Sequence, residues 1–332
     1  MRLKIWLPLS VLGLALVAGV FWWLERSAPP PATSLTLALP QRPATAAAFL
    51  GLKDGDFQRQ GLKVTLLNNA TAVVGLSQLR AGQADVALMV GASFVLARLK
   101  GDPLVVLASI YQANDHYAIV ARKDKGIAGP ADLAGKKIGV TMPTSNAYFA
   151  HAYGLAHGVA IPDERIVGLS LEQSLPALLA GTVDALVAFP PWIAKAEQAL
   201  GGQAVILRDP TIYPVNFVLV STRAWAQENG PALRALLTGL KSASEQIRQK
   251  PEDTLARLAL ALNLEPALIK SSFVPANYRV RLHPELLGML EAQQAWALKR
   301  GSSPSASPQP MLDSIWFPGL EAVDPSAVTI RH

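Results

Sequence analysis

Strand-like and helix-like segments alternate along most of this chain, and this alternation constrains its fold more than any single motif does. Between residues 35 and 219, short apolar runs are followed by segments with helical spacing, and after residue 216 the chain is nearly all helical. Such alternation is typical of βαβ units, so it predicts an α/β fold with mainly parallel sheets. The predicted strands are 35–39, 63–67, 85–90, 104–109, 137–141, 165–169, 184–188 and 204–207. The predicted helices between them are 45–53, 72–80, 93–100, 147–157, 172–180 and 191–200.

One pattern occurs twice and indicates two lobes of similar construction. The pattern L-x-A-G-x-x-D begins at Leu79 and again at Leu178, 99 positions later. In each copy the glycine stands where a helix C-terminus needs a left-handed residue, and the aspartate stands where the next strand begins. Helix-glycine-strand junctions are common in α/β proteins, so the repeat supports two lobes without establishing them.

The segment 132–148, D-L-A-G-K-K-I-G-V-T-M-P-T-S-N-A-Y, predicts a strand, a polar loop and a helix start. Pro143 cannot donate a ladder hydrogen bond, so the strand ends before it. Thr144, Ser145 and Asn146 are residues that cap helices. A helix N-terminus leaves backbone N–H groups unpaired and carries partial positive charge. This helix start can therefore receive an anion or polar oxygen, or it can be an ordinary turn that binds nothing.

The N-terminus predicts export from the cytoplasm. Arg2 and Lys4 precede an uncharged apolar run over residues 5–24, which is long enough to cross a bilayer as a helix. Basic residues before such a run favour a cytoplasmic N-terminus, which places the rest of the chain outside. We expect an uncleaved membrane anchor over residues 1–27, with a cleaved secretory signal as the alternative, and a Pro-rich spacer at 28–34.

The composition excludes several kinds of chemistry. The 332-residue chain contains no cysteine, which excludes disulfides, thiolate metal sites and a cysteine nucleophile. Asp115 and His116 are adjacent, but neighbours in a strand point to opposite faces and cannot form an acid–base pair. The chain has no H-E-x-x-H motif, so we expect no metal site. We also expect neither a cofactor nor enzymatic activity. The net charge of +6 is mild and dispersed, which suits anionic solutes but does not indicate nucleic-acid binding.

Several further motifs follow one another in an order that is more specific than any one of them. They are Gly61-Leu62-Lys63-Val64, Ala81-Gly82-Gln83-Ala84-Asp85-Val86-Ala87, Tyr111-Gln112 before a strand at 117–122, the segment 132–148, and Ala180-Gly181-Thr182-Val183-Asp184-Ala185. Through this order the chain resembles the substrate-binding proteins of ABC importers that handle sulfonates, taurine, nitrate and thiamine-precursor pyrimidines. The resemblance extends from residue 35 to about residue 225.

The resemblance implies a two-lobed periplasmic-binding-protein type II fold with a hinge of two crossover segments, near 113–117 and 213–217. The first lobe is then expected at 35–112 with a helical return at 218–300, the second lobe at 113–217, and a C-terminal extension at 301–332.

It also implies a periplasmic or cell-surface monomer that binds a small-molecule ligand between its lobes and delivers it to a membrane permease and its ATPase. A membrane-anchored ligand sensor that signals to a membrane partner is the alternative. A thiamine-pyrimidine biosynthesis enzyme is a weaker one, because that family carries an iron-linked cysteine cluster.

Ligands of open α/β sheets bind beyond the carboxyl ends of the strands, where this chain offers mostly small, amidic or hydroxylic residues. Arg42 can bind an oxyanion in bidentate fashion or lie on the surface, and Phe189 can stack on a ring or pack in the core. Relatives often have W-E-P where this chain has Phe189-Pro190-Pro191-Trp192 without an acid, which disfavours zwitterions such as taurine. The candidate ligand-binding residues are Gln41, Arg42, Gly91, Ser93, Gln112, Asn114, Thr144, Ser145, Asn146, Phe189 and Asn216.

Overall fold

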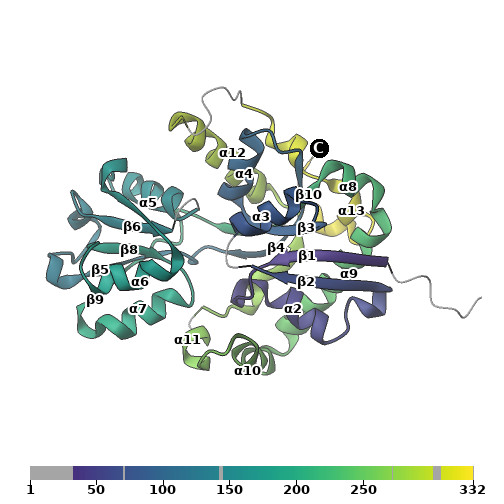
Figure 1. Ribbon diagram of the computed structural model, residues 1–332, viewed down its shortest axis with the longest axis horizontal. Coiled ribbons are helices and arrows are strands. Elements are labelled where there is room, and N and C mark those ends of the chain that lie inside the picture. The colour runs from purple at the N-terminus through teal and green to yellow at the C-terminus, as the bar shows by residue number, and fades with distance from the viewer. Residues whose placement is uncertain (1–32, 70–71, 142–144, 271, 302–307, 332) are drawn as a thin grey trace, which may run out of the picture.

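The protein consists of two lobes, each built on its own β-sheet and covered by helices (Figure 1). The computed structural model describes residues 33–69, 72–141, 145–270, 272–301 and 308–331. The expected membrane segment at 1–27 and the candidate Thr144 lie outside the described residues. The spacer expected at 28–34 overlaps the first strand, which begins at Thr33. In the described part of the chain, every helix is too short or too polar to cross a membrane.

The first lobe holds a six-stranded sheet in the order β11-β4-β10-β3-β1-β2. Its strands are β1 (Thr33–Leu39), β2 (Leu62–Asn68), β3 (Val86–Val90), β4 (Leu104–Ala113), β10 (Val215–Thr222) and β11 (Tyr278–Arg281). Its helices are α2 (Ala46–Lys53), α3 (Ala72–Arg80), α4 (Gly91–Leu99), α8 (Arg223–Glu228), α9 (Gly230–Gln249), α10 (Pro251–Leu262), α11 (Pro266–Lys270), α12 (Pro284–Lys299) and α13 (Phe317–Glu321). Strands β3, β4 and β10 are almost wholly buried, as expected for strands covered on both faces.

The second lobe holds a five-stranded sheet in the order β7-β6-β8-β5-β9. Its strands are β5 (Ala118–Arg122), β6 (Ile138–Thr141), β7 (Ile166–Leu169), β8 (Ala185–Ala188) and β9 (Ala204–Leu207). Its helices are α5 (Ser145–Ala156), α6 (Leu171–Leu179) and α7 (Trp192–Leu200). The predicted strands and helices of both lobes are found close to their expected positions, which confirms the α/β assignment.

Both sheets are mixed, which corrects the expectation of mainly parallel sheets. The pairs β1–β2, β1–β3, β6–β7 and β6–β8 are parallel, whereas β10 and β5 run antiparallel to both of their neighbours. The start of β10 pairs with the end of β4, Val215 opposite Ala113. A strand that returns from the other lobe enters its sheet where the outgoing strand leaves, so it must run in the opposite direction. The chain after residue 216 is also less helical than expected, because β10 continues to Thr222 and β11 follows at Tyr278–Arg281.

The chain passes between the lobes twice, over residues 114–117 and 208–214. The first crossing coincides with the expected hinge segment at 113–117. The second overlaps the expected segment at 213–217 only at residues 213 and 214, because β10 already begins at Val215. Two crossings that lie at one end of both sheets allow the lobes to move about them as a hinge.

The repeated L-x-A-G-x-x-D pattern has the same structure in both lobes. Gly82 and Gly181 have φ values of 68° and 73°, which lie in the left-handed region that favours glycine. The Asp85 carboxylate accepts a 2.7 Å hydrogen bond from the N–H of Thr36, and the Asp184 carboxylate accepts a 2.9 Å bond from the N–H of Lys137. In each lobe the aspartate therefore joins its own strand to the neighbouring parallel strand.

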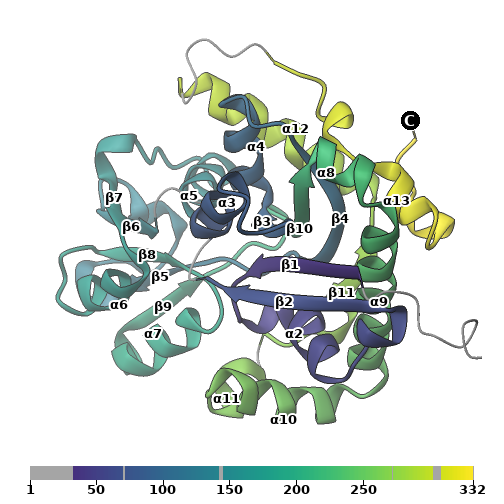
Figure 2. The same cartoon turned by 45° about the vertical axis from the view of Figure 1, so that its right-hand side comes forward.

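The C-terminal extension packs onto the first lobe. The N–H of Trp316 donates a 2.8 Å hydrogen bond to the carbonyl of Val106 in β4. Leu282, just after β11, exchanges backbone hydrogen bonds with Ala327 and Thr329. Helices α9 and α13 lie side by side on this part of the lobe (Figure 2). The extension therefore covers the β11 edge of the sheet, where a free strand would expose unpaired backbone groups.

Candidate inter-lobe site

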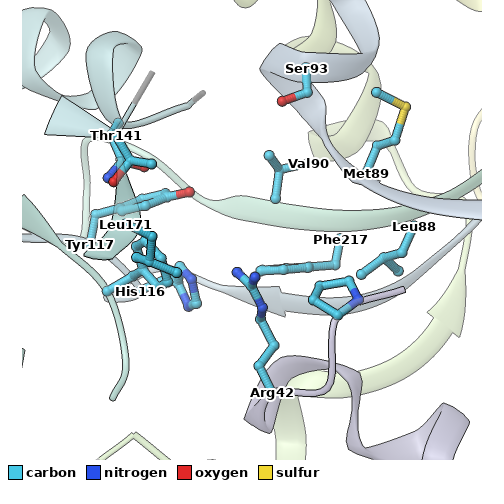
Figure 3. A pocket seen from close by; sticks show the side chains of 13 residues that line it. Arg42, Leu88, Met89, Val90, Ser93, His116, Tyr117, Thr141, Leu171 and Phe217 are labelled. Carbon is cyan, nitrogen blue, oxygen red and sulfur yellow. The ribbon is translucent and has the colours of Figure 1, made fainter. Parts of the chain in front are cut away.

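A cavity of about 50 Å³ lies between the two lobes, beside the first crossing (Figure 3). A volume of this size holds a few water-sized groups, so it suits the head group of a small solute. The carboxyl ends of β1, β3, β6 and β8 all reach it, as expected for ligand sites of open α/β sheets. Its lining residues are Pro40, Arg42, Leu88, Met89, Val90, Ser93, His116, Tyr117, Thr141, Asn146, Leu171, Phe189 and Phe217.

The first lobe contributes a cation and a hydroxyl group from opposite sides. Arg42 follows β1, and its guanidinium group points into the cavity beside Phe217 (Figure 3). Ser93 approaches from the first turn of α4 and is 7 % exposed. Among the described residues, Ser93 Oγ has no hydrogen-bond partner. Because a buried polar atom without a partner is costly, Ser93 is available to a bound ligand.

The second lobe contributes Thr141 at the end of β6 and Asn146 in the first turn of α5. Both side chains are buried, with exposed fractions of 6 % and 2 %. Asn146 Nδ2 donates a 3.2 Å hydrogen bond to the carbonyl of Val187 in β8, which fixes the orientation of its amide. Helices α4, α5 and α6 all begin at the cavity, so their partial positive charges point towards it.

Aromatic rings form the wall at the crossing between β4 and β5. The ring of His116 stacks on Phe189 with centroids 6.0 Å apart and meets Phe217 edge-on at 5.2 Å. Tyr117 stacks on the buried Tyr213 at 5.6 Å, so residues of both crossings touch. The rings are 2 % to 6 % exposed except for the half-buried Phe189. This packing makes the cavity wall rigid where the lobes are joined.

The electrostatics of the cavity favour an anion. Burial lowers the pKa of Arg42 to about 10, so its guanidinium remains charged at neutral pH. Burial, together with the charges of Arg42 and Arg208, lowers the pKa of His116 to about 3, so this ring is neutral. Burial raises the pKa of Tyr117 to about 12, against the opposing effects of Ser145 and Arg42. None of the described residues that line the cavity is acidic, so its only ionised lining group is a cation.

A second, outer cavity of about 240 Å³ adjoins the first and shares Pro40, Arg42, Leu171 and Phe189 with it. The Arg42 guanidinium lies 5.5 Å from the centre of the Phe189 ring, and these two side chains separate the cavities. The remaining outer lining comes from both lobes and is mostly apolar. It consists of Gln41, Pro43, Asn68, Asn69, Pro190, Pro191, Trp192, Leu262 and Leu264.

The structure brings four of the predicted site residues together around the inner cavity. These are Arg42, Ser93, Asn146 and Phe189. Gln41 lies in the outer cavity. Ser145 lies behind the wall, fully buried against the hydroxyl groups of Tyr117 and Tyr213.

The other predicted residues serve the fold or face the solvent. Gln112 accepts a hydrogen bond from Arg281, and the buried Asn216 bonds to Ser109 and His283. Gly91 packs against α12, where an added Cβ would lie 2.5 Å from Met289 Cε. Asn114 is exposed at the first crossing.

Sequence reasoning missed His116, Tyr117, Thr141 and Phe217. His116 was considered only as a partner for Asp115, although its position at a crossing between lobes was the informative signal. Phe217 and the residues of β3 are ordinary apolar strand residues, and no local pattern distinguishes them from core. In the described part of the chain, no three histidine or acidic side chains converge in a way that could hold a metal ion.

Two lobes joined by two crossings, with a positively charged cavity between them, define a solute-binding protein of the periplasmic type. The family model described as NMT1/THI5 like matches residues 42–254, and the chain belongs to this family.

The chain is similar to a formylaminopyrimidine-binding protein of Halalkalibacterium halodurans, at 26 % identity over 223 residues that make up 62 % of this chain and 63 % of the relative. The chain thus spans less than two thirds of the length of this curated relative.

Two solved structures share the fold. The alkanesulfonate-binding protein SsuA from Xanthomonas axonopodis pv. citri, bound to MOPS, has a TM-score of 0.71 at 20 % identity and covers 87 % of this chain and 99 % of its own. The periplasmic aliphatic sulphonate-binding protein SsuA from Escherichia coli has a TM-score of 0.73 at 18 % identity, covering 87 % of this chain and 93 % of its own.

Proposed function

We propose that this protein is the extracytoplasmic solute-binding component of an ABC importer, and that its solute carries an anionic head group. Sulfonates and nitrate are the expected classes, with thiamine-precursor pyrimidines as the competing class. The observation that carries the proposal is the inner cavity, where Arg42 and the starts of three helices converge without an acidic lining residue among those described.

The arrangement suits an oxyanion better than a cation or a neutral base. Charge-assisted hydrogen bonds from a guanidinium to an oxyanion are shorter and stronger than those between neutral groups. Ser93 Oγ and the Asn146 side chain add polar contacts from the two lobes. An anion between the lobes would contact both of them, so it would favour the closed form over an open one. Closure is then the signal that a membrane permease and its ATPase can detect.

Membership in the NMT1/THI5-like family, and the likeness to a curated binding protein, support delivery of a solute over a sensory role. The apolar segment 5–24 supports a location outside the cytoplasm, tethered to the membrane or released by cleavage.

A thermal-shift screen of the full-length protein tests the ligand class. The panel contains alkanesulfonates, nitrate, bicarbonate and aminopyrimidines. A ligand at 100 times its Kd adds about 2.7 kcal/mol to the free energy of unfolding, which gives a measurable rise in Tm. We expect one of the anions to raise Tm. Stabilisation by the aminopyrimidines alone would contradict an anionic head group.

The variant Arg42→Gln links that binding to the cavity. We expect it to weaken anion binding by about tenfold or more, because a charge-assisted hydrogen bond is lost. The matched control is Arg165→Gln, which removes the same charge at an exposed position in the second lobe and should leave the affinity unchanged. Isothermal titration calorimetry measures both, and equal affinities of the two variants would remove Arg42 from the site.

A further inference from the structure

A separate cavity of about 290 Å³ lies on the first lobe, between α9, β11 and the C-terminal extension. In the described part of the chain, it shares no lining residue with the inter-lobe cavities. Its lining consists of Lys241, Ser244, Arg248, Arg279, Val280, Arg281, His283, Asp324, Ser326, Ala327 and Thr329. Figure 2 shows α9 and α13 with β11 behind them on this part of the molecule.

Two elements direct basic side chains at this cavity. Lys241, Ser244 and Arg248 follow one another at spacings of three and four residues, so they share one face of α9. Arg279 and Arg281 alternate with the buried Tyr278 and Val280 on β11, and both arginines line the cavity. Among the described residues, four basic side chains therefore line the cavity together with a single acidic one, Asp324.

Most of this positive charge is paired with neutral acceptors. Arg248 Nη1 donates to the carbonyls of Ser244 and Tyr278 at 3.2 and 2.7 Å. Arg279 donates to the carbonyl of Ala276 at 3.3 Å, and Arg281 donates to the side-chain oxygen of Gln112.

Carboxylates compensate only part of the charge. Asp324 binds Lys241 at 2.6 Å, and the exposed Glu245 lies 3.9 Å from Arg248. The exposed Glu285 bonds to His283 at 2.8 Å. Burial, together with the charge of Arg279, lowers the pKa of Arg281, while the charge of Glu285 acts in the opposite direction. An anion placed between the two arginines would relieve their repulsion.

A buried hydroxyl group at the cavity gives an independent indication of a ligand. Ser244 is 1 % exposed, and among the described residues its Oγ has no hydrogen-bond partner. A helical serine usually bonds to the carbonyl one turn earlier or lies in water, and this one does neither. Because an unsatisfied buried hydroxyl is costly, its retention beside four cations fits a ligand that supplies an acceptor.

We propose that this cavity is a second binding site, for a small oxyanion with more than one negative charge, of which the phosphate dianion is the simplest example. Arg279, Arg281 and Arg248 provide charge-assisted donors with fork geometry, and Ser244 donates its hydroxyl from the helix side. The site is formed only when the C-terminal extension lies against β11, since residues 324–329 make one of its walls.

Calorimetric titration of full-length protein with inorganic phosphate at pH 7.5 tests the proposal, with the ionic strength held constant by sodium chloride. The titration uses the Arg42→Gln variant, so that the inter-lobe cavity contributes little to the heat. We expect saturable binding of one phosphate. The double variant Arg279→Gln/Arg281→Gln, in the same background, should weaken it by about tenfold or more.

The control Arg165→Gln/Arg234→Gln removes the same charge at exposed positions and should keep the phosphate affinity within about twofold, since surface charges contribute little. Ser244→Ala should weaken phosphate binding without lowering the Tm measured in the absence of phosphate, because the hydroxyl it removes has no hydrogen-bond partner among the described residues. Absence of saturable phosphate binding, or equal binding by the two double variants, would overturn the proposal. These two outcomes would leave the proposed solute binding between the lobes untouched. That binding is measured separately, by the calorimetric titrations of the Arg42→Gln and Arg165→Gln variants with anions.

Discussion

Two residues set the charge of the inter-lobe cavity, and they act through their burial. Arg42 is half-buried over the face of Phe189, and His116 is buried in a cluster of aromatic rings. Burial disfavours the charged form of both. Arginine starts from so high a pKa that it stays charged, whereas histidine becomes neutral throughout the physiological range. The cavity therefore keeps one positive charge that does not vary with pH near neutrality.

His116 should make the stability of the protein depend on pH. Its pKa falls from 6.5 in the unfolded chain to about 3 in the folded protein, through burial and the nearby arginines. The folded state then binds fewer protons, so this contribution is fully present above pH 6.5 and is lost as pH falls towards 3. As pH is lowered, we expect the free energy of unfolding to fall faster in wild type than in His116→Phe. The difference between the two slopes should be up to ~1.4 kcal/mol per pH unit. Urea denaturation between pH 7 and pH 5 measures the difference, and parallel curves would show that His116 is not shifted.

Trp192 should select among solutes by their tails. It lines the outer cavity, where Lys195 lies 4.7 Å from the centre of its ring. We expect Trp192→Ala to weaken binding of a sulfonate with a butyl or aromatic tail by ~1–2 kcal/mol, since apolar contact area is lost. Methanesulfonate should bind the variant and the wild type alike, because its head group fits the inner cavity. If calorimetry shows equal losses for both ligands, the outer cavity does not hold the tail.

At the scale of elements, the packing of α4 on α12 places Ser93 at the cavity. Gly91 at the start of α4 lets the two helices approach closely, since a Cβ there would lie 2.5 Å from Met289 Cε and 2.6 Å from Gln293 Oε1. Gln293 in turn donates a 2.9 Å hydrogen bond to the hydroxyl of Tyr213 at the second crossing. Gly91 thus has a role in helix packing, and its predicted contact with the ligand stays a prediction.

Gly91→Ala should therefore destabilise the protein by about 1 kcal/mol, the low end of the cost of overpacking, because the atoms that its Cβ would meet are the ends of the flexible Met289 and Gln293 side chains. Gly288 in α12 provides the control, because its added Cβ would have nothing within 4 Å. Gly288→Ala should raise the free energy of unfolding by about 0.5–1 kcal/mol, as alanine replaces glycine in a helix. Equilibrium urea unfolding compares the two, and equal effects would contradict the close approach of α4 and α12.

At the scale of the whole molecule, the two crossings and the shared cavity predict that a bound solute brings the lobes together. Arg42 and Ser93 belong to one lobe, and Thr141 and Asn146 to the other, so an anion in the cavity contacts both. A ligand shifts an equilibrium only through its differential affinity, and these contacts exist together only in the closed form.

Small-angle X-ray scattering should accordingly show a smaller radius of gyration when a solute found in the thermal-shift screen is added. Asn146→Ala should reduce this change at a fixed solute concentration, because it removes a contact from the second lobe. An unchanged radius at saturating solute would argue that the lobes are already closed or do not move.

Much of the fold was accessible from the sequence, because it follows from local regularities. Strand and helix periods depend on which residues are apolar at close spacing, and these placed the elements of both lobes to within a few residues. The two copies of L-x-A-G-x-x-D predicted similar lobes, and Asp85 and Asp184 make equivalent bonds in them. The order of motifs indicated the family and hence the two-lobed fold. The antiparallel direction of β5 and β10 was not accessible, since it depends on where the chain crosses between lobes.

The composition of the site was decided by the tertiary structure. Strand ends could be located from the sequence, but the direction of a side chain and its partners depend on residues far away in the chain. Asn216 and Gln112 lie at strand ends as predicted, but their side chains form hydrogen bonds with His283 and Arg281 within the first lobe. His116, Tyr117 and Phe217 look like hinge or core residues in the sequence and become cavity walls because two crossings meet there. The sequence thus determined the two lobes through short-range periodicity, whereas long-range packing decided which side chains face the space between them.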